Sequence, residues 1–308
     1  MPYDLSNYLV IGVSSRALFD LSLENEIYEK EGLEAYCRYQ LEHENDVLKP
    51  GTGYALIEAI LRINDIEAGV RRTEVVIISR NSADTSLRIS NSIDHYSLDI
   101  TRAAFTGGEP VAKYLNAFEV DLFLSATEED VQAAVDSDVA AGLIYDGPSQ
   151  NRADPLQQIR IAFDGDAVLF SKESEMIYQQ QGLEAFIEHE KENAQQPLPE
   201  GPFAKLLKTL SFLQFDLDSN TSQNETPLRT ALVTARNSPA HERVIRTLRT
   251  WNVRIDETFF LGGVPKHKIL ESFSPHIFFD DQHQHCEGAA RVVPTARVPH
   301  LDDETKTA

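Results

Sequence analysis

The chain has 308 residues, which is enough for two domains with hydrophobic cores of their own. It carries 49 acidic and 28 basic residues, and the net charge of −21 argues against binding to nucleic acid polymers or to anionic membranes. Hydrophobic residues make up 42% of the chain, and none of the apolar runs reaches the length of about 20 residues that could span a bilayer. The two cysteines, and a start (residues 1–10) without a basic segment followed by a long apolar one, predict a reduced, cytoplasmic protein.

An internal repeat organises the chain. Residues 11–60 align without a gap on residues 161–210, and the pattern I-Y-x-x-x-G-L-E-A occurs in both copies. Further on, the tract SRNS parallels ARNS, and residues 100–123 parallel residues 255–278. Because the two halves keep register over so long a distance, we expect two copies of one fold.

Each copy alternates apolar runs with amphipathic segments, which predicts an α/β fold with a mostly parallel sheet and helices on both faces. In the first copy we expect strands at residues 9–13, 75–79, 102–106, 122–124 and 142–145. In the second copy we expect them at residues 159–163, 230–234, 257–261, 277–279 and 292–298. The polar stretch 216–227 predicts a loop, and the tail after Pro299 is expected to fray.

The segment between the first two strands of each copy is too long for a crossover, so it predicts a small helical cap over the strand ends. Residues 147–158, with two prolines and several polar residues, are the natural boundary between the copies. We therefore expect one domain at residues 1–147 and a second at residues 158–300, with its cap at about 171–228.

The copies differ where their first and fourth strands end. The second copy has carboxylates at these ends, namely Asp164, Asp166, Asp280 and Asp281. The first copy has, at the aligned positions, Ser14, Arg16, Ser125 and Ala126. Ligands of open α/β sheets lie beyond the carboxyl ends of the strands, so the four carboxylates should converge there and require a hard cation, for which we expect Mg²⁺. A lone Asp-Gly-Asp is usually a turn, but two acidic pairs that the sister copy lacks favour a metal site.

These features resemble the haloacid dehalogenase-like phosphohydrolases and, along nearly the full length, the class I cytosolic 5′-nucleotidases. The tracts that carry the closer resemblance include VSSRALFDL, GLEAY, YQLEHE, NSIDHYSLDITRAAFTGG, AFDGDAVLFS, LRTWNVRIDETFFLGG and HIFFDD. The resemblance implies two tandem Rossmann-like repeats, each with a cap insertion, of which the second is active and the first degenerate. It also implies Mg²⁺-dependent hydrolysis of nucleoside 5′-monophosphates in the cytosol.

The resemblance also implies roles for the acidic residues. Asp164 would be the nucleophile that forms an aspartyl-phosphate, and Asp166 would be the general acid and then the base. The metal would be held by Asp164, by the backbone carbonyl of Asp166 and by the pair Asp280 and Asp281, of which the direct ligand stays open. His283 and His285 form H-x-H, for which a transition-metal site is the less favoured alternative.

Further residues are expected at the substrate. Thr234 would hydrogen-bond a phosphoryl oxygen, and the expected substrate contacts are Arg236, Asn237 and Gly263. The lysine that neutralises the phosphate is Lys266 by resemblance to the family tract, although the internal repeat aligns Lys268 with a lysine of the first copy. We favour Lys266 and keep Lys268 as the alternative.

Other functions remain as alternatives. The same chemistry could act on a sugar phosphate or another small phosphomonoester, because only the cap selects the leaving group. A third interpretation is that the protein is a nucleotide sensor that binds nucleotides without hydrolysing them. In the first copy, Arg16 turns the strand end towards anions, which suggests a regulatory nucleotide, whereas the plainer interpretation is that this copy only supports the active one. An oligomer is compatible with the sequence, which does not determine it.

Overall fold

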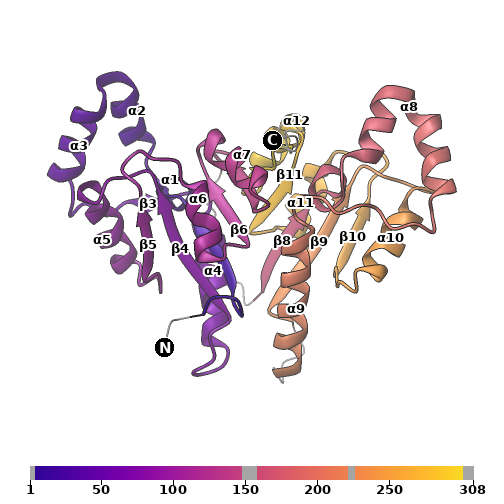
Figure 1. The fold of residues 1–308 in the computed structure, drawn as a ribbon, viewed down its shortest axis with the longest axis horizontal. Coiled ribbons are helices and arrows are strands. Elements are labelled where there is room, and N and C mark those ends of the chain that lie inside the picture. Colours follow the sequence, from indigo (N-terminus) through magenta and orange to yellow (C-terminus); the bar gives the residue numbers. More distant parts are fainter. Residues whose placement is uncertain (1–3, 148–157, 221–225, 301–308) are drawn as a thin grey trace. The chain divides into compact units, whose positions relative to one another are not determined.

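The computed structural model describes residues 4–147, 158–220 and 226–300. The chain divides into two compact units, Met1–Asn151 and Arg152–Ala308. Each unit is a mixed α/β structure built on a parallel sheet (Figure 1). The expected boundary segment lies almost wholly outside the described residues, as does the tail from residue 301.

In the first unit, the described strands form a parallel sheet in the order β7-β6-β1-β4-β5. Their bounds are β1 Leu9–Val13, β4 Thr73–Ser79, β5 Arg102–Phe105, β6 Leu122–Ser125 and β7 Ala140–Ile144. The central strand β1 is buried along its whole length, which is why its sequence is continuously apolar. A short antiparallel pair, β2 Phe19–Asp20 and β3 Lys49–Pro50, lies within the cap segment.

In the second unit the order is β10-β9-β8-β11-β12, again parallel. The bounds are β8 Ile159–Phe163, β9 Leu228–Thr234, β10 Glu257–Phe260, β11 Ile277–Asp280 and β12 Thr295–Arg297. The central strand is β1 in the first unit and β8 in the second, and each is the first strand of its parallel sheet in chain order. On one side lies the next strand of that sheet, β4 or β9, and on the other side lies the fourth, β6 or β11. The carboxyl ends of β8 and β11 are therefore neighbours, because Phe163 pairs with Phe279.

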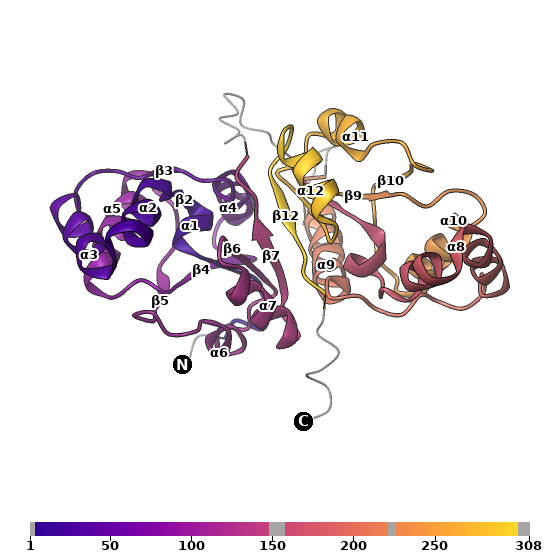
Figure 2. The ribbon, with the colours of Figure 1, turned by 90° about the horizontal axis from the view of Figure 1, so that it is seen from above.

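Helices cover both faces of each sheet. Those of the first unit are α1 Ser15–Leu18, α2 Ser22–Glu31, α3 Leu33–Glu42, α4 Tyr54–Leu61, α5 Leu87–His95, α6 Ala112–Leu115 and α7 Glu128–Asp136, with short 3₁₀ turns at η1 Arg62–Asp65, η2 Asp84–Ser86 and η3 Asn116–Phe118. Those of the second unit are α8 Glu173–Glu192, α9 Ala204–Asn220, α10 His241–Thr250, α11 Lys266–Phe273 and α12 His283–Ala290. Figure 2 shows α4 on one side of the first unit's strands and α6 and α7 on the other.

The cap helices lie beyond one end of the strands in each unit, α2 and α3 in the first and α8 in the second (Figure 1). A glycine with a left-handed φ interrupts the helical backbone of each cap: Gly32, with φ 85°, lies between α2 and α3, and Gly182, with φ 84°, lies within α8. Because residues with a Cβ rarely adopt this φ, the shared glycine sets the bend between the two arms of each cap.

The core of the second unit packs behind its site. Phe163, Phe203 and Phe279 are fully buried, and the ring centroids of Phe203 and Phe279 lie 4.8 Å apart. Phe163 ends β8 and Phe279 is the next-to-last residue of the neighbouring β11, and each directly precedes an aspartate. The aromatic packing therefore fixes the backbone from which those aspartates project.

All ten expected strands are present, and the differences are mostly of one or two residues at their ends. The last strand, β12, is shorter than the expected 292–298. The loop expected at 216–227 is wrong at its start, because α9 continues to Asn220. Leu217 is fully buried and Asp218 pairs with Arg254, so tertiary contacts hold these polar residues in the helix. Residues 221–225 lie outside the described part.

Candidate active site

Three aspartates converge at the carboxyl ends of β8 and β11. Asp164 follows β8, Asp280 ends β11, and Asp281 comes next. One carboxylate oxygen from each lies within 4.8 Å of the others, and all three side chains are buried. The acidic pairs that distinguish the second copy thus contribute three of their four carboxylates to one buried cluster.

Lys266, the first residue of α11, is the cation of this cluster. Its Nζ donates to Oδ1 of Asp164 at 2.6 Å and to Oδ2 of Asp280 at 2.7 Å. Burial lowers the pKa of Lys266, but the two carboxylates outweigh burial and keep that pKa above its ordinary value. Lys268, two residues further along, is exposed. Of the two candidate lysines, the structure therefore places Lys266 at the carboxylates.

The cluster has more negative charge than its lysine can balance. Burial, more than the neighbouring carboxylates, raises the pKa of Asp164 to about 7 and that of Asp281 to about 9. For Asp280, burial acts in the same direction, but Lys266 and His285 outweigh it and lower the pKa. When ionised, three carboxylates and one ammonium group leave two negative charges, which a divalent cation would neutralise.

Asp281 is the residue that most requires a cation. Both of its carboxylate oxygens are buried and neither accepts a hydrogen bond from the described residues, while His300 Nε2 lies 3.7 Å from Oδ2. Buried carboxylate oxygens without a donor are costly unless a proton or a metal ion occupies them. An all-oxygen donor set fits a hard divalent cation such as Mg²⁺.

Asp166 points to a different partner. Its carboxylate accepts two hydrogen bonds from Arg236, from Nε at 2.8 Å and from Nη2 at 2.6 Å. It lies in the turn η4 (Gly165–Leu169), in which Ala167 has a left-handed φ of 59°. A non-glycine residue there costs about 1 to 3 kcal/mol, and such strain gathers at functional sites. The aligned turn of the first unit is the ordinary helix α1.

Thr234 ends β9 beside this turn. Its Oγ1 accepts a hydrogen bond from the backbone N–H of Arg236 at 3.2 Å. A Cβ placed on Gly165 would lie 3.3 Å from the same oxygen, so the hydroxyl lies next to the backbone between Asp164 and Asp166. Thr234 is therefore buried beside the backbone that joins Asp164 and Asp166.

Asn237 and Gly263 lie further out, and both are exposed. The side chain of Asn237 lies 3.2 Å from where a Cβ of Gly262 would be, so it packs on the glycine turn after β10. Gly263 has a φ of 92° and open space around it, so its backbone conformation, rather than crowding, requires a glycine there. The structure places these two residues near the β9 and β10 ends but not in the buried cluster.

The H-x-H motif does not form a second metal centre. His283 Nε2 lies 3.3 Å from Oε1 of Glu287 on the exposed side of α12, whereas His285 Nδ1 lies 3.3 Å from Asp280. Among the described residues, the group of three metal-ligand side chains is that of the aspartates. The less favoured transition-metal interpretation thus has no support from the geometry.

Sequence reasoning missed two acidic residues of the cap helix α8. Glu190 is buried and pairs with Arg236 and Arg243. Glu175 Oε1 accepts a hydrogen bond from Gln282 Nε2 at 3.1 Å, and burial followed by Asp166 raises the pKa of Glu175. The repeat carried a signal for both, because the first copy has amides at the aligned positions.

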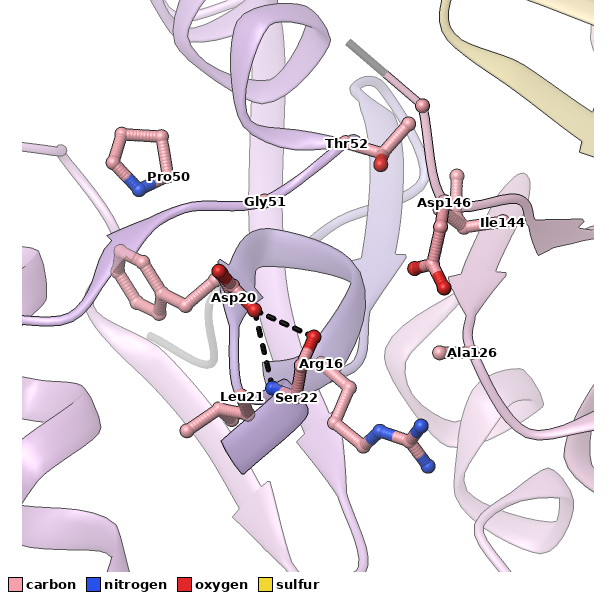
Figure 3. A pocket seen from close by; sticks show the side chains of 12 residues that line it. Arg16, Asp20, Leu21, Ser22, Pro50, Gly51, Thr52, Ala126, Ile144 and Asp146 are labelled. Carbon is pink, nitrogen blue, oxygen red and sulfur yellow. Dashed lines mark hydrogen bonds between the residues drawn. The ribbon is translucent and has the colours of Figure 1, made fainter. Parts of the chain in front are cut away.

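The strand ends of the first unit hold a cavity instead of an acidic cluster. Its volume is about 230 Å³, and the residues in Figure 3 include Arg16, Asp20, Ser22, Thr52 and Asp146. Asp20 accepts hydrogen bonds from the backbone N–H and the hydroxyl of Ser22. Lys266 aligns with a buried valine, Val111. The described part of this unit contains no converging group of three metal-ligand side chains.

A parallel α/β sheet with buried carboxylates and a lysine at its carboxyl edge is typical of α/β enzymes, whose ligands lie beyond the carboxyl ends of the strands. Residues 1–305 match the family model described as 5′-nucleotidase, and the chain belongs to this family. It is 39% identical over 292 residues to cytosolic 5′-nucleotidase 1B from Homo sapiens, across 93% of this chain and 48% of that protein. The 5′-nucleotidase family expected from the sequence tracts is thereby confirmed.

The chain spans about half the length of this curated relative. Among solved structures, histidinol dehydrogenase from Elizabethkingia anophelis aligns over 99% of this chain and 77% of its own, with 9% identity and a TM-score of 0.24. A score that low carries no argument about fold or function. Within the described residues, no helix combines the length and the apolar character needed to cross a membrane.

Proposed function

We propose that this protein is a Mg²⁺-dependent 5′-nucleotidase that hydrolyses nucleoside 5′-monophosphates to nucleoside and phosphate in the cytoplasm. The single observation that carries the proposal is the buried cluster of Asp164, Asp280 and Asp281 around Lys266, in which no residue of the described part of the chain donates a hydrogen bond to Asp281. Family membership and the name of the human relative support the nucleotide substrate and the location.

In this proposal a carboxylate oxygen of Asp164 attacks phosphorus, and the bond from phosphorus to the nucleoside 5′-oxygen breaks. Asp166 donates a proton to the departing oxygen, and then accepts one from the water that hydrolyses the aspartyl-phosphate. Dividing the displacement in this way returns both aspartates to their starting state.

The metal has a defined place in the proposal. Asp164, Asp280, Asp281 and the backbone carbonyl of Asp166 would hold Mg²⁺, whose charge would neutralise the carboxylates and the phosphoryl oxygens. Lys266 supplies a second positive charge at the attacking oxygen. The cation and the lysine together allow an anionic nucleophile to approach an anionic phosphate.

The remaining residues bind the substrate. The hydroxyl of Thr234 donates to a phosphoryl oxygen, and the buried Arg236 adds positive charge on the side of Asp166. Asn237 and Gly263, on the exposed rim, contact the leaving nucleoside. Their exposure supports a part in substrate selection rather than in the phosphoryl transfer itself.

We also propose that the two units are tandem haloacid dehalogenase-like repeats, at residues 1–147 and 158–300, each with a helical cap. The cap of the second repeat covers about residues 171–228. The common strand order and the glycine bends at Gly32 and Gly182 support a duplication. The loss of all four carboxylates from the first repeat supports its degeneration.

The cavity of the first unit is proposed as the site of a regulatory nucleotide. Arg16 offers a cation for a phosphate, while Asp20, Thr52 and Asp146 offer oxygens to sugar hydroxyls (Figure 3). If the cavity acts in this way, a nucleoside di- or triphosphate should change the rate of the wild type but not that of Arg16→Ala. Equal responses of the two proteins would reject the site and leave the first unit a supporting role.

One experiment tests the main proposal against its alternatives. Phosphate release is measured on nucleoside monophosphates and on sugar phosphates, with and without Mg²⁺. Metal-dependent release from the nucleotides supports the proposal. Faster release from sugar phosphates would favour a different phosphomonoesterase, and tight nucleotide binding without release would favour a sensor.

A further inference from the structure

A buried network of ion pairs connects the cap helix α8 with the turn that carries Asp166. Glu190, whose side chain is fully buried, accepts hydrogen bonds from Arg236, from Arg243 Nη1 at 3.0 Å and from Ser174 Oγ at 2.8 Å. Burial acts to raise the pKa of Glu190, but Arg236 and Ser174 outweigh it and lower that pKa, so this residue is an anion. Arg236 in turn holds Asp166 with two hydrogen bonds. Glu190 is thus linked to Asp166 through a single side chain, that of Arg236.

The guanidinium group of Arg236 is fixed on three sides. Its Nη1 donates to Glu190, its Nε and Nη2 donate to Asp166, and its Cζ lies 5.4 Å from the centroid of the Phe186 ring. Because a guanidinium is a rigid planar fork, the bond on one edge sets the direction of the other edge. Glu190 therefore determines where the carboxylate of Asp166 is held.

The charges of this network balance only with both carboxylates. Arg236 and Arg243 are almost fully buried, and Glu190 and Asp166 are their anionic partners. Removing one partner of a buried ion pair leaves the other uncompensated, and the cost is large. Without Glu190, Arg243 would lose its anionic partner and Arg236 would keep Asp166 as its only anionic partner among the described residues, with no hydrogen bond to fix its other edge.

The first unit shows that the fold does not require an acid at the position of Glu190. The aligned residue is Gln40, which accepts a hydrogen bond from Arg88 Nη1 at 3.2 Å. The charge of Arg88 is met by Glu24, at 2.6 Å, and Glu24 aligns with Ser174. A carboxylate on the first cap helix, with an amide on the second, is therefore sufficient to join this cap to its sheet.

The arginine of the cap junction has the same place in both units. Arg88 Nε donates to the backbone carbonyl of Asp46, and Arg243 Nε donates to that of Gln196, each at 3.0 Å. The residue aligned with Arg236 in the first unit is Arg80, which pairs with Asp130, so the pairing of this arginine with Asp166 distinguishes the second unit. In the first unit the carboxylate, Glu24, pairs with the junction arginine. In the second unit the carboxylate is at the other aligned position, Glu190, where it pairs with the junction arginine and also with Arg236.

We propose that Glu190 is a positioning residue, which acts through Arg236 to hold Asp166 where it can exchange a proton with the nucleoside 5′-oxygen. The inference rests on the proposed function, in which Asp166 is the general acid. It assigns the cap helix α8 a part in the chemical step and not only in selecting the leaving group.

The double variant Ser174→Glu/Glu190→Gln tests the inference, because it gives Arg243 the two neighbours that Arg88 has in the first unit. The number of charges is kept and Arg243 keeps a carboxylate, but Arg236 loses one. We expect a melting temperature close to that of the wild type, an unchanged KM, and a kcat for nucleoside monophosphates that is lower by about 10- to 100-fold. An aryl phosphate, whose leaving group needs little protonation, should lose much less.

A double variant with the wild-type kcat on nucleotides would overturn the inference, as would equal losses on nucleotide and aryl phosphate. If the double variant does not fold, Glu190→Asp replaces it, since the shorter acid keeps its charge but withdraws from Arg236. A reduced kcat at constant KM is expected, and wild-type kcat would again overturn the inference. Asp166→Asn distinguishes the two failures: wild-type nucleotide turnover in that variant would reject the acid role that the proposed function gives Asp166, whereas reduced turnover there with a wild-type kcat in the Glu190 variants would reject only the role of Glu190.

Discussion

Lys266 Nζ lies 2.6 Å from Oδ1 of Asp164, so the ammonium group at the start of α11 is in direct contact with the carboxylate at the end of β8. The same ammonium group reaches Asp280 at 2.7 Å. This contact brings together the strand-end acid, the helix-borne cation and the second strand-end acid in one buried place.

Asp164→Asn should abolish phosphate release, with a loss of at least roughly 10⁴-fold in kcat, because an amide cannot act as the nucleophile. Circular dichroism should show an unchanged fold, since the amide is nearly isosteric. The matched control is Ser14→Ala, the aligned residue of the first unit, which should leave kcat near that of the wild type. Turnover by Asp164→Asn at the wild-type rate would contradict the assignment.

Asp166→Asn should slow nucleotide hydrolysis more than hydrolysis of an activated aryl phosphate, by about 10²-fold or more on the nucleotide. The difference arises because protonation matters most for a basic leaving oxygen. Steady-state kinetics on the two substrates measure it. Equal losses on both would show that Asp166 is not the acid.

Lys266→Met should lower kcat by about 10²- to 10³-fold, because the positive charge at the nucleophile and phosphate is lost. Lys268→Met is the matched control, since that side chain is exposed and two residues away. It should retain wild-type activity. The opposite pattern would move the phosphate lysine to position 268.

The metal-free protein should become less stable as the pH rises. The pKa values of Asp164, about 7, and Asp281, about 9, exceed the ordinary 3.8, so the folded chain binds protons that the unfolded chain has released. Stability from these groups is present below pH about 4 and is lost as the pH rises towards about 9. Thermal melts in a chelator should therefore show a falling melting temperature across this range.

Mg²⁺ supplies the control for this pH dependence. A bound cation replaces the protons, so the decline in melting temperature should be much smaller with Mg²⁺ than with chelator. A metal-free protein whose melting temperature rises steadily between these pH values would contradict the burial of these acids.

The acidic cluster could be predicted from the sequence because the chain contains two copies of one repeat, which can be compared position by position. Asp164, Asp280 and Asp281 differ from the first copy at strand ends, and parallel topology brings those ends together. The choice of Lys266 over Lys268 depends on helix phase, which turns residues two apart to different faces. That phase requires the start of α11, which the sequence locates only to within a few residues.

Other features could not be read from the sequence. The pairing of Arg236 with Asp166 and Glu190 depends on side-chain directions across three separate segments. The end of α9 was misjudged because its polar composition favours a loop, whereas Leu210, Leu213 and Leu217 continue the buried face of the helix. Local composition was outweighed there by packing.

The thermal shift that Mg²⁺ causes tests the central claim most directly. At about a hundred times its Kd, a bound ion adds roughly 2.7 kcal/mol to the stability of the native state. The melting temperature of the wild type should therefore rise with Mg²⁺. Asp280→Ser/Asp281→Ala, which inserts the aligned residues of the first unit, should show no rise and no phosphate release, while melting higher than the wild type without metal. A double variant that keeps the Mg²⁺-dependent shift would contradict the account, because the metal would then be held elsewhere.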